Sequence, residues 1–210
     1  TKSLPTQVYG EHGTHVAGII GANHNGIQIA GLAPEVSLVS LSHPLTVGTE
    51  RVAQLASGFG YATTHGIDVI NNSWGDQGGR LYQQLHSSLL EESIQNALTN
   101  GRNGKGMVVV FASGNQAGQR TDYPGYMFPD ALIVGSISSN LKRSYFSTYD
   151  DKLDVMAPGG DILSTLPGNS TGKMSGTSMA APYATALASL VLSVNPSLTN
   201  SDVCRIIEQT

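Results

Sequence analysis

A serine lies between small residues at the start of an apolar segment near the end of the chain. The stretch reads Ser175-Gly176-Thr177-Ser178-Met179-Ala180-Ala181-Pro182, and mostly small and apolar residues continue to about Val194. Small neighbours allow a substrate backbone to approach closely. The first turn of a helix offers free N–H groups and the positive end of the helix dipole to a developing oxyanion. Ser178 therefore has the surroundings of a nucleophile, although a helix-capping serine is the commoner interpretation of one such residue alone.

Two stretches upstream carry side chains that could assist a nucleophilic serine. His12 and His15 flank Gly13-Thr14 where a segment rich in small and apolar residues begins, and we expect a buried helix there. Asn115 follows Ala112-Ser113-Gly114, directly after an unbroken apolar run. An imidazole can act as a general base, and a carboxamide can donate a hydrogen bond to an oxyanion. A core histidine and a turn-forming asparagine are the alternative interpretations when each residue is considered alone.

Bulk composition indicates one globular α/β domain over residues 1–210. Hydrophobic residues make up 40% of the 210 and charged residues 12%, which is unlike a disordered chain. The net charge of −4 argues against a nucleic-acid partner. No apolar run approaches the roughly 18 residues of a membrane span. The single cysteine, Cys204, excludes an internal disulfide and a thiolate metal cluster.

Strand and helix patterns alternate along the chain. We expect strands at 36–41, 68–73, 107–112, 131–137 and 153–156, and helices from about 12, 50–65, 81–98, 179–194 and from 199. This order predicts a mostly parallel, twisted sheet flanked by helices on both faces. In such sheets the reacting groups gather at the carboxyl ends of the strands, where Trp74-Gly75 and Asn115 fall.

Three stretches together resemble the motifs of subtilisin-type serine peptidases, the subtilases. They are His12-Gly13-Thr14-His15-Val16-Ala17-Gly18, Ala112-Ser113-Gly114-Asn115 and Gly176-Thr177-Ser178-Met179-Ala180-Ala181-Pro182, in this order. Gly31-Leu32-Ala33-Pro34 and Asn71-Asn72-Ser73-Trp74-Gly75 also resemble family segments. The resemblance runs from about Gly10 to the last residues. It implies a subtilisin-like three-layer sandwich and a secreted or extracytoplasmic protein.

The resemblance implies a serine endopeptidase that works through an acyl-enzyme. Ser178 is the implied nucleophile, and His12 takes its proton and later protonates the leaving amine. Asn115 is implied to stabilise the oxyanion together with the backbone N–H of Ser178. His15 matches a structural histidine of the motif and is given no catalytic role.

The implied substrate is an extended polypeptide that pairs with the backbone of Ser73-Trp74-Gly75 as an added strand. Ala112-Ser113-Gly114 then forms the other wall of the pocket for the side chain before the cut. An acid at Asp122 would favour Lys or Arg there. A turn-capping, exposed Asp122 and a plain core position for Trp74 are the alternatives.

One family element is missing from the motif set. The family's triad aspartate lies on a strand before the histidine helix, and residues 1–11 contain no Asp. We therefore expect missing N-terminal strands and a missing C-terminal end, with the N-terminal part supplied as a separate chain or another segment. Loss of this aspartate costs subtilisin itself about 3 × 10⁴ in turnover, so the chain alone should be weak or inactive.

The loop from Asn23 to Ile29 resembles the family's calcium loop. The implied oxygen ligands of a structural Ca²⁺ are the Asn25 side chain and the carbonyls of Asn23, Ile27 and Ile29. The N-terminal groups that complete the site in the family are not found here, so an empty loop is the alternative.

Two other functions fit the same residues. A non-catalytic peptide-binding relative would keep the cleft without the triad, and the absent Asp favours it. A transpeptidase or macrocyclase would use the same acyl-enzyme and differ only in the nucleophile that resolves it.

Overall fold

A four-stranded parallel sheet forms the middle layer of the computed structural model, which describes residues 8–44 and 50–210. Its strands lie in chain order: β1 (Val69–Asn72), β2 (Val108–Ala112), β3 (Leu132–Ile137) and β4 (Val155–Pro158). All neighbouring pairs run parallel, with Ile70 opposite Val109 and Phe111 opposite Ile133. The strands therefore end at one edge of the sheet, as the sequence predicts.

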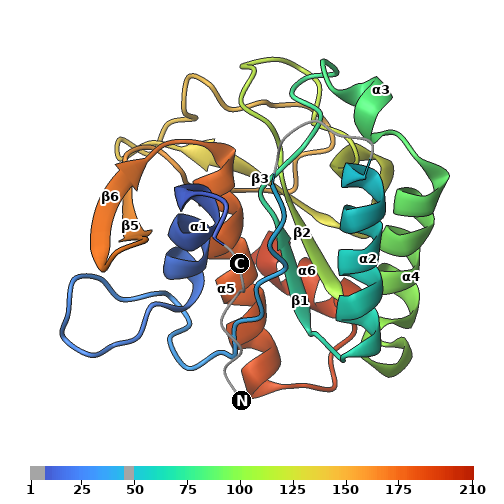
Figure 1. The fold of residues 1–210 in the computed structure, drawn as a ribbon, viewed down its shortest axis with the longest axis horizontal. Coiled ribbons are helices and arrows are strands. Elements are labelled where there is room, and N and C mark those ends of the chain that lie inside the picture. Colours follow the sequence, from blue (N-terminus) through green and yellow to red (C-terminus); the bar gives the residue numbers. More distant parts are fainter. Residues whose placement is uncertain (1–7, 45–49) are drawn as a thin grey trace.

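Helices cover both faces of this sheet, which confirms the expected α/β sandwich (Figure 1). On one face lie α2 (Arg51–Thr64) and α4 (Ser88–Gly104). On the other lie α5 (Thr177–Val194) and α6 (Asn200–Gln209), with α1 (Glu11–Gly21) packed against α5. The short α3 (Tyr82–Leu85) and a 3₁₀ turn (Gly125–Met127) lie in the connections.

The apolar run of β2 explains why the sheet is covered twice. Val109 and Phe111 belong to the core cluster with α2 and α4, whereas Val108 and Val110 belong to the cluster with α5 and α6. Successive side chains of a strand point to opposite faces, so a strand buried on both sides must be apolar throughout. All five residues of β2 are buried.

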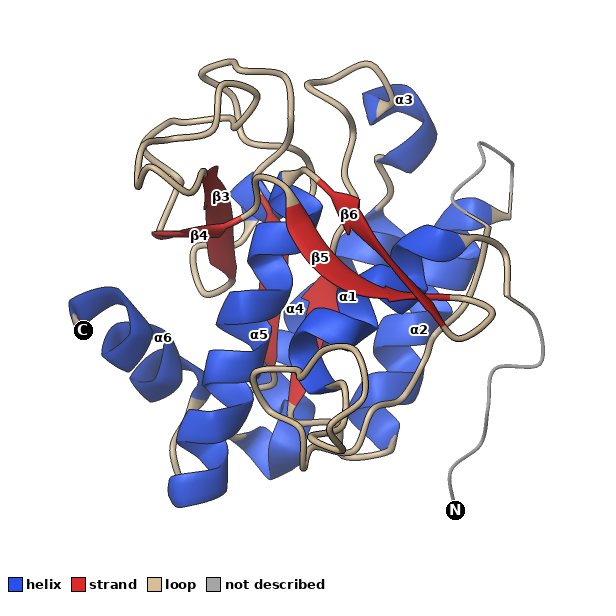
Figure 2. Ribbon diagram, turned by 90° about the vertical axis from the view of Figure 1, so that its left-hand side faces the viewer, coloured by secondary structure: helices blue, strands red, loops and turns tan. Residues whose placement is uncertain are grey.

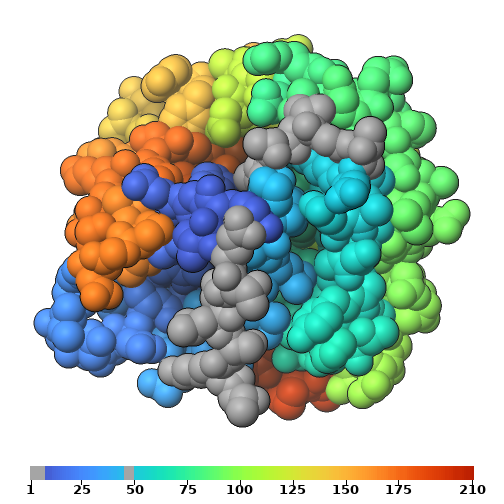
Figure 3. Space-filling model, viewed as in Figure 1, coloured from blue at the N-terminus to red at the C-terminus, as the bar shows by residue number. Residues whose placement is uncertain are grey.

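The strand expected at 36–41 is not a strand in the structure. Residues 37–44 make no backbone hydrogen bonds within the described part of the chain, and Leu38 and Val39 remain 48% and 49% exposed. Figure 3 shows this light-blue segment at the surface between α1 and α2. A strand forms only where a neighbour accepts its ladder of hydrogen bonds, and among the described residues β1 is paired on the β2 side only.

An antiparallel hairpin lies outside the main sheet and was not expected from the sequence. It joins β5 (Ile162–Leu166) to β6 (Ser170–Met174) and lies against α1 (Figure 2). Gly18 of α1 makes this contact close, because a Cβ at that position would collide with the hydroxyls of Ser164 and Thr165.

Helix α5 is longer and more apolar than the sequence analysis expected, since no segment was predicted to have the length and composition of a membrane span. By length and composition alone, its 18 residues with a mean hydropathy of 1.3 could cross a membrane. In the structure Ala180, Ala184 and Ala188 are buried in the cluster that contains the sheet. The apolar composition therefore matches a central helix that packs closely on a sheet.

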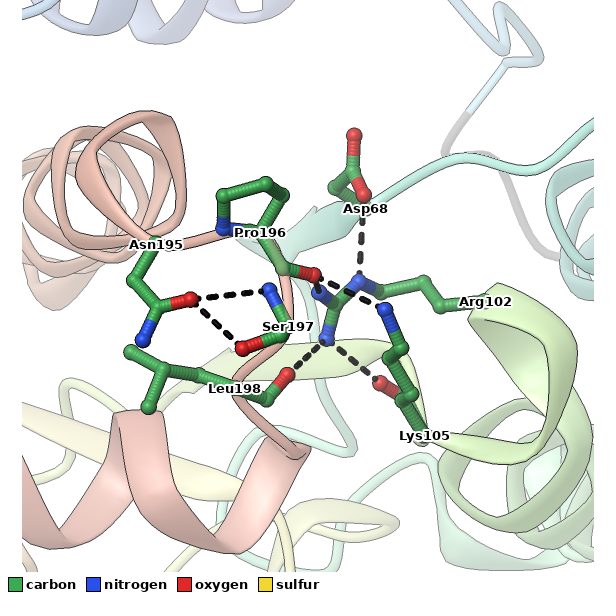
Figure 4. Close-up of polar contacts among 8 residues, drawn as sticks. Asp68, Arg102, Lys105, Asn195, Pro196, Ser197 and Leu198 are labelled. Atoms are coloured by element: carbon green, nitrogen blue, oxygen red, sulfur yellow. Dashed lines mark hydrogen bonds and ion pairs between the residues drawn. The ribbon is translucent and has the colours of Figure 1, made fainter.

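A buried arginine joins the far end of α4 to the connection between α5 and α6 (Figure 4). Arg102 Nε donates to Asp68 Oδ1 at 3.0 Å, and Nη1 donates to the carbonyls of Gly106 and Leu198 at 3.2 and 3.0 Å. Its Nη2 donates to the Pro196 carbonyl at 3.1 Å. The Arg102 side chain is only 4% exposed, so its donors have little access to water as a substitute for these partners.

We predict that Arg102→Met lowers the free energy of unfolding by about 2–4 kcal/mol, because it removes the donor from one buried carbonyl and two part-buried ones. Urea denaturation measures the loss. Arg205→Met is the matched control, since Arg205 pairs with Asp202 at the surface and such pairs contribute at most about 1 kcal/mol. Equal losses for the two variants would contradict the structural role of Arg102.

Candidate active site

Ser178 is the second residue of α5 and lies next to the end of β1. The side chain of Ser73 donates to the Ser178 carbonyl at 2.9 Å, and Ser178 Oγ donates to the Ser73 carbonyl at 3.4 Å. Asn71 supports this contact, because its amide donates to Ser73 Oγ at 2.9 Å. The first turn of the apolar helix therefore presents a half-buried hydroxyl at the edge where the parallel strands end.

Asn115 approaches the same turn from the end of β2. Its Oδ1 accepts hydrogen bonds from the backbone N–H of Thr177 at 2.8 Å and from the Thr177 hydroxyl at 3.1 Å. Thr177 Oγ1 in turn accepts from the Gly114 N–H at 3.2 Å. These contacts fix the orientation of the amide, so that its NH₂ end is left without an acceptor among the described residues. Asn115 thus offers a free donor beside Ser178, and Thr177, which the sequence argument gave no role, is the residue that orients it.

His12 lies in the first turn of the neighbouring helix. It precedes Val16 by four residues and so shares a helix face with it, and Val16 packs with Met179, the residue after Ser178. Figure 1 shows α1 and α5 side by side, both beginning at the edge where β1 and β2 end. Within the described residues no hydrogen bond joins His12 to Ser178. The structure therefore places the imidazole and the hydroxyl at corresponding helix starts without a direct bond.

The electrostatic surroundings of His12 disfavour its charged form. Burial lowers the pKa of His12 first, and the neighbouring His15 lowers it further. Within residues 8–44 and 50–210, no carboxylate opposes these two effects. The ring is therefore held as the neutral imidazole that a general base requires, but without an acid to stabilise the imidazolium that proton transfer creates.

His15 holds the hairpin against α1. It is fully buried, and its Nε2 donates to the carbonyls of Ile162 and Gly172 at 3.0 and 3.1 Å. These bonds place the ring proton on Nε2. This position agrees with the structural role implied by the sequence motif.

A cavity of about 150 Å³ collects most of the predicted site residues. Those lining it are Ser73, Trp74, Gly75, Ala112, Gly114, Asn115, Asp122 and Ser178. Ser113 and His12 are not in the lining: Ser113 is fully buried, with its carbonyl accepting from the Asp122 N–H at 2.9 Å. Arg51 and Gln116 also line the cavity, and no local sequence pattern pointed to either.

Trp74 combines both interpretations that the sequence left open. It lines the cavity, and its ring also contacts Phe111 edge to face at 5.7 Å between centroids. The indole is therefore a cavity wall fixed by the core beneath it.

Asp122 lies deep beneath the two loops that follow β1 and β2. It is 6% exposed, so the exposed turn cap is not what the structure shows. A Cβ at Gly75 or Gly114 would come within 2.6 or 2.8 Å of its side chain, so only glycine admits the carboxyl group there. Burial raises the pKa of Asp122 to about 7, although the Gly78 N–H donates to Oδ1 at 2.7 Å. Asp122 is an acid that titrates near neutral pH at the base of the cavity.

Hydrogen bonds within the loop from Asn23 to Ile29 engage two of the implied calcium ligands. The Asn23 carbonyl accepts from the Asn25 N–H at 3.0 Å, and Asn25 Oδ1 accepts from the Ile27 N–H at 3.0 Å. Two of the implied ligand oxygens are thus used in holding the turn, and the loop contains no carboxylate. Among the residues that the structure describes, no cluster of three or more His, Cys, Asp or Glu could hold a metal.

Comparisons with known proteins agree on one family. A model of the subtilase family matches residues 3–210. Subtilisin NAT of Bacillus subtilis subsp. natto is 37% identical over 213 residues, covering 100% of this chain and 53% of that protein. The chain thus spans about half the length of the first curated relatives that it matches.

Solved structures show the same architecture. The crystal structure of a cold-adapted subtilisin-like serine proteinase matches with a TM-score of 0.78 and 27% identity, over 99% of this chain and 70% of that one. The self-cleaved protease domain of PatA matches with a TM-score of 0.75 and 29% identity, over 98% of this chain and 77% of that one.

Calcium remains a prediction, and the neutral oxygens of the loop support only a weak site. We expect the melting temperature in millimolar Ca²⁺ to exceed that in a chelator by less than about 3 °C. Differential scanning calorimetry measures the difference, and Asn25→Ala should remove whatever part of it comes from this loop. A shift of ten degrees that disappears in Asn25→Ala would show that the loop binds calcium tightly.

Proposed function

This chain belongs to the subtilase family, and we propose that it carries the acyl-transfer centre of a serine endopeptidase. One observation supports this most directly. Ser178 lies in the first turn of an apolar helix, and Asn115 lies beside it. Thr177 binds the oxygen of the Asn115 amide, so the NH₂ group remains free, and both Ser178 and Asn115 line one cavity. The whole protein is proposed to be extracytoplasmic, on the family resemblance.

The proposed reaction begins with attack of Ser178 Oγ on a substrate carbonyl carbon. The hydroxyl proton passes to His12, and the carbonyl oxygen becomes an oxyanion. The Asn115 NH₂ group and the Ser178 N–H, at the positive end of the α5 dipole, donate to that oxyanion. His12 then protonates the leaving amine, and a water molecule resolves the acyl-enzyme by the reverse steps.

The proposed substrate is an extended polypeptide. Ser73, Trp74 and Gly75 continue from the end of β1 and line the cavity that contains Ser178. Their backbone is available for strand-like pairing, which gives affinity without regard to sequence. Selection among peptides is then left to the side chains of the cavity.

We propose that rapid peptide hydrolysis needs a carboxylate that hydrogen-bonds to His12. The described residues do not provide one. Among the described residues, no acidic side chain near His12 would stabilise its imidazolium form. Another segment, joined to this chain or separate from it, would supply the group.

The same observation favours the second candidate, a peptide-binding relative without turnover. Incubating the protein with a peptide pool and an added amine separates three outcomes by mass spectrometry: hydrolysis, transfer to the amine, or unchanged peptide.

We predict that Asn115→Ala lowers kcat by about 10²–10³ and changes KM little, the effect known for the corresponding asparagine of subtilisin itself. Thr177→Val should lower kcat in the same direction but less, because it removes one of two hydrogen bonds that orient the amide. Thr177→Ser is the matched control that keeps the hydroxyl. Steady-state kinetics that leave kcat unchanged in Asn115→Ala would remove the oxyanion role.

We further propose that Asp122 selects a basic side chain before the cut, and we predict a pH signature. Because its pKa is about 7, the carboxylate is charged above this pH and neutral below it. The ratio of kcat/KM for matched peptides with Lys and with Met should rise as pH increases from about 6 to 8. His12 affects both peptides equally, so its titration cancels in the ratio. The ratio should be independent of pH in Asp122→Asn, and a preference for Leu or Phe over Lys would refute the proposal.

A further inference from the structure

An arginine that is buried in the wall of the cavity has two donor nitrogens without a partner among the described residues. Arg51 is the first residue of α2, is 5% exposed and lines the cavity that contains Ser178. Its Nε and Nη1 have no hydrogen-bond acceptor among the residues that the structure describes. Buried guanidinium groups normally have their donors satisfied, so Arg51 lacks a hydrogen-bond acceptor that the described residues do not provide.

None of the described residues supplies an anion to Arg51. None of the ion pairs among the described residues involves Arg51, and residues 1–7 and 45–49 contain no Asp or Glu. Burial alone lowers the pKa of Arg51, and no carboxylate raises it. A buried positive charge without a counter-charge is costly, so a site that keeps one has a use for it.

Asp122, the one acid that lines the cavity, does not pair with Arg51. Asp122 lies against Gly75 and Gly114 and accepts from the Gly78 N–H, and no ion pair joins it to Arg51. Arg51 reaches the cavity from the start of α2, where the helix dipole adds to its positive charge. A ligand that fills the cavity therefore meets a cation that no described carboxylate neutralises.

We propose that Arg51 determines specificity by binding the side-chain carboxylate of a Glu or Asp near the scissile bond of the substrate. The inference rests on the proposed function, since it assumes that a peptide occupies the cavity. The planar guanidinium with free N–H donors matches a carboxylate in shape and charge. A small cavity that holds both Arg51 and Ser178 requires the acidic residue to lie close to the cut.

The test measures binding without turnover, in the full chain carrying Ser178→Ala. Fluorescent, N-acetylated and C-amidated peptides differ only in Glu or Gln at one position, which is scanned along the peptide. Fluorescence anisotropy should give a Kd at least about tenfold lower for Glu than for Gln at one position. Adding Arg51→Met should bring this ratio to about one, whereas Arg205→Met, far along the chain on α6, should leave it unchanged.

Two further measurements distinguish the possible causes of a preference for Glu over Gln. A Gln peptide with a free C-terminal carboxylate should gain nothing; if it alone binds tightly, the ligand is a chain terminus and the side-chain proposal is wrong. Arg51→Met should not lower the melting temperature, because the Arg51 side chain forms no hydrogen bond or ion pair with any described residue. A loss of several degrees would assign Arg51 to stability instead.

The outcomes also distinguish this inference from the proposed function. Glu preference with no turnover of any peptide by the whole protein, with Ser178 intact and with the segment that supplies the acid for His12, supports Arg51 and refutes the peptidase. Turnover with a Glu-to-Gln ratio near one at every position, or a ratio that survives Arg51→Met, refutes the role of Arg51 alone. Absence of binding for every peptide refutes both.

Discussion

Two hydrogen bonds from Thr177 to the Asn115 side chain hold the start of α5 against the end of β2. One of them comes from the helix backbone, so the amide is fixed by the same N–H group that the helix start leaves free. Because the oxygen of the amide is occupied, its nitrogen is the end that remains for a ligand. The orientation of the Asn115 amide thus follows from its hydrogen bonds to the start of α5. The Gly114 N–H donates to Thr177 Oγ1 and so holds the Thr177 hydroxyl in place.

Close packing brings His12, Asn115 and Ser178, the three groups of the proposed reaction, to one edge of the sheet. Small side chains let α5 lie on β2 and β3, and α1 lies on α5 through Val16 and Met179. Gly18 then lets the hairpin lie on α1, where His15 binds its carbonyls. The position of His12 is therefore set by a chain of contacts from the sheet outward. Among the described residues, these contacts supply no acid for His12, and we propose that full activity needs one.

The sequence predicted those parts of the molecule that local patterns specify. The run of β2 had to be covered on both faces, and three motifs placed Asn115 and Ser178 in one cavity. The segment 36–41 has the composition of a strand but no partner for its backbone, and pairing is a non-local property. Arg51 and the depth of Asp122 were also beyond prediction, because the burial of each depends on loops and helices distant in sequence.

The central claim is that Ser178 is a nucleophile activated by His12, and active-site labelling tests it most directly. A fluorophosphonate should react with the protein at Ser178, located by mass spectrometry of the digested adduct. His12→Ala should slow the labelling by about 10² or more, the usual contribution of a general base. Labelling at a different serine, or an equal rate in His12→Ala, would contradict the account.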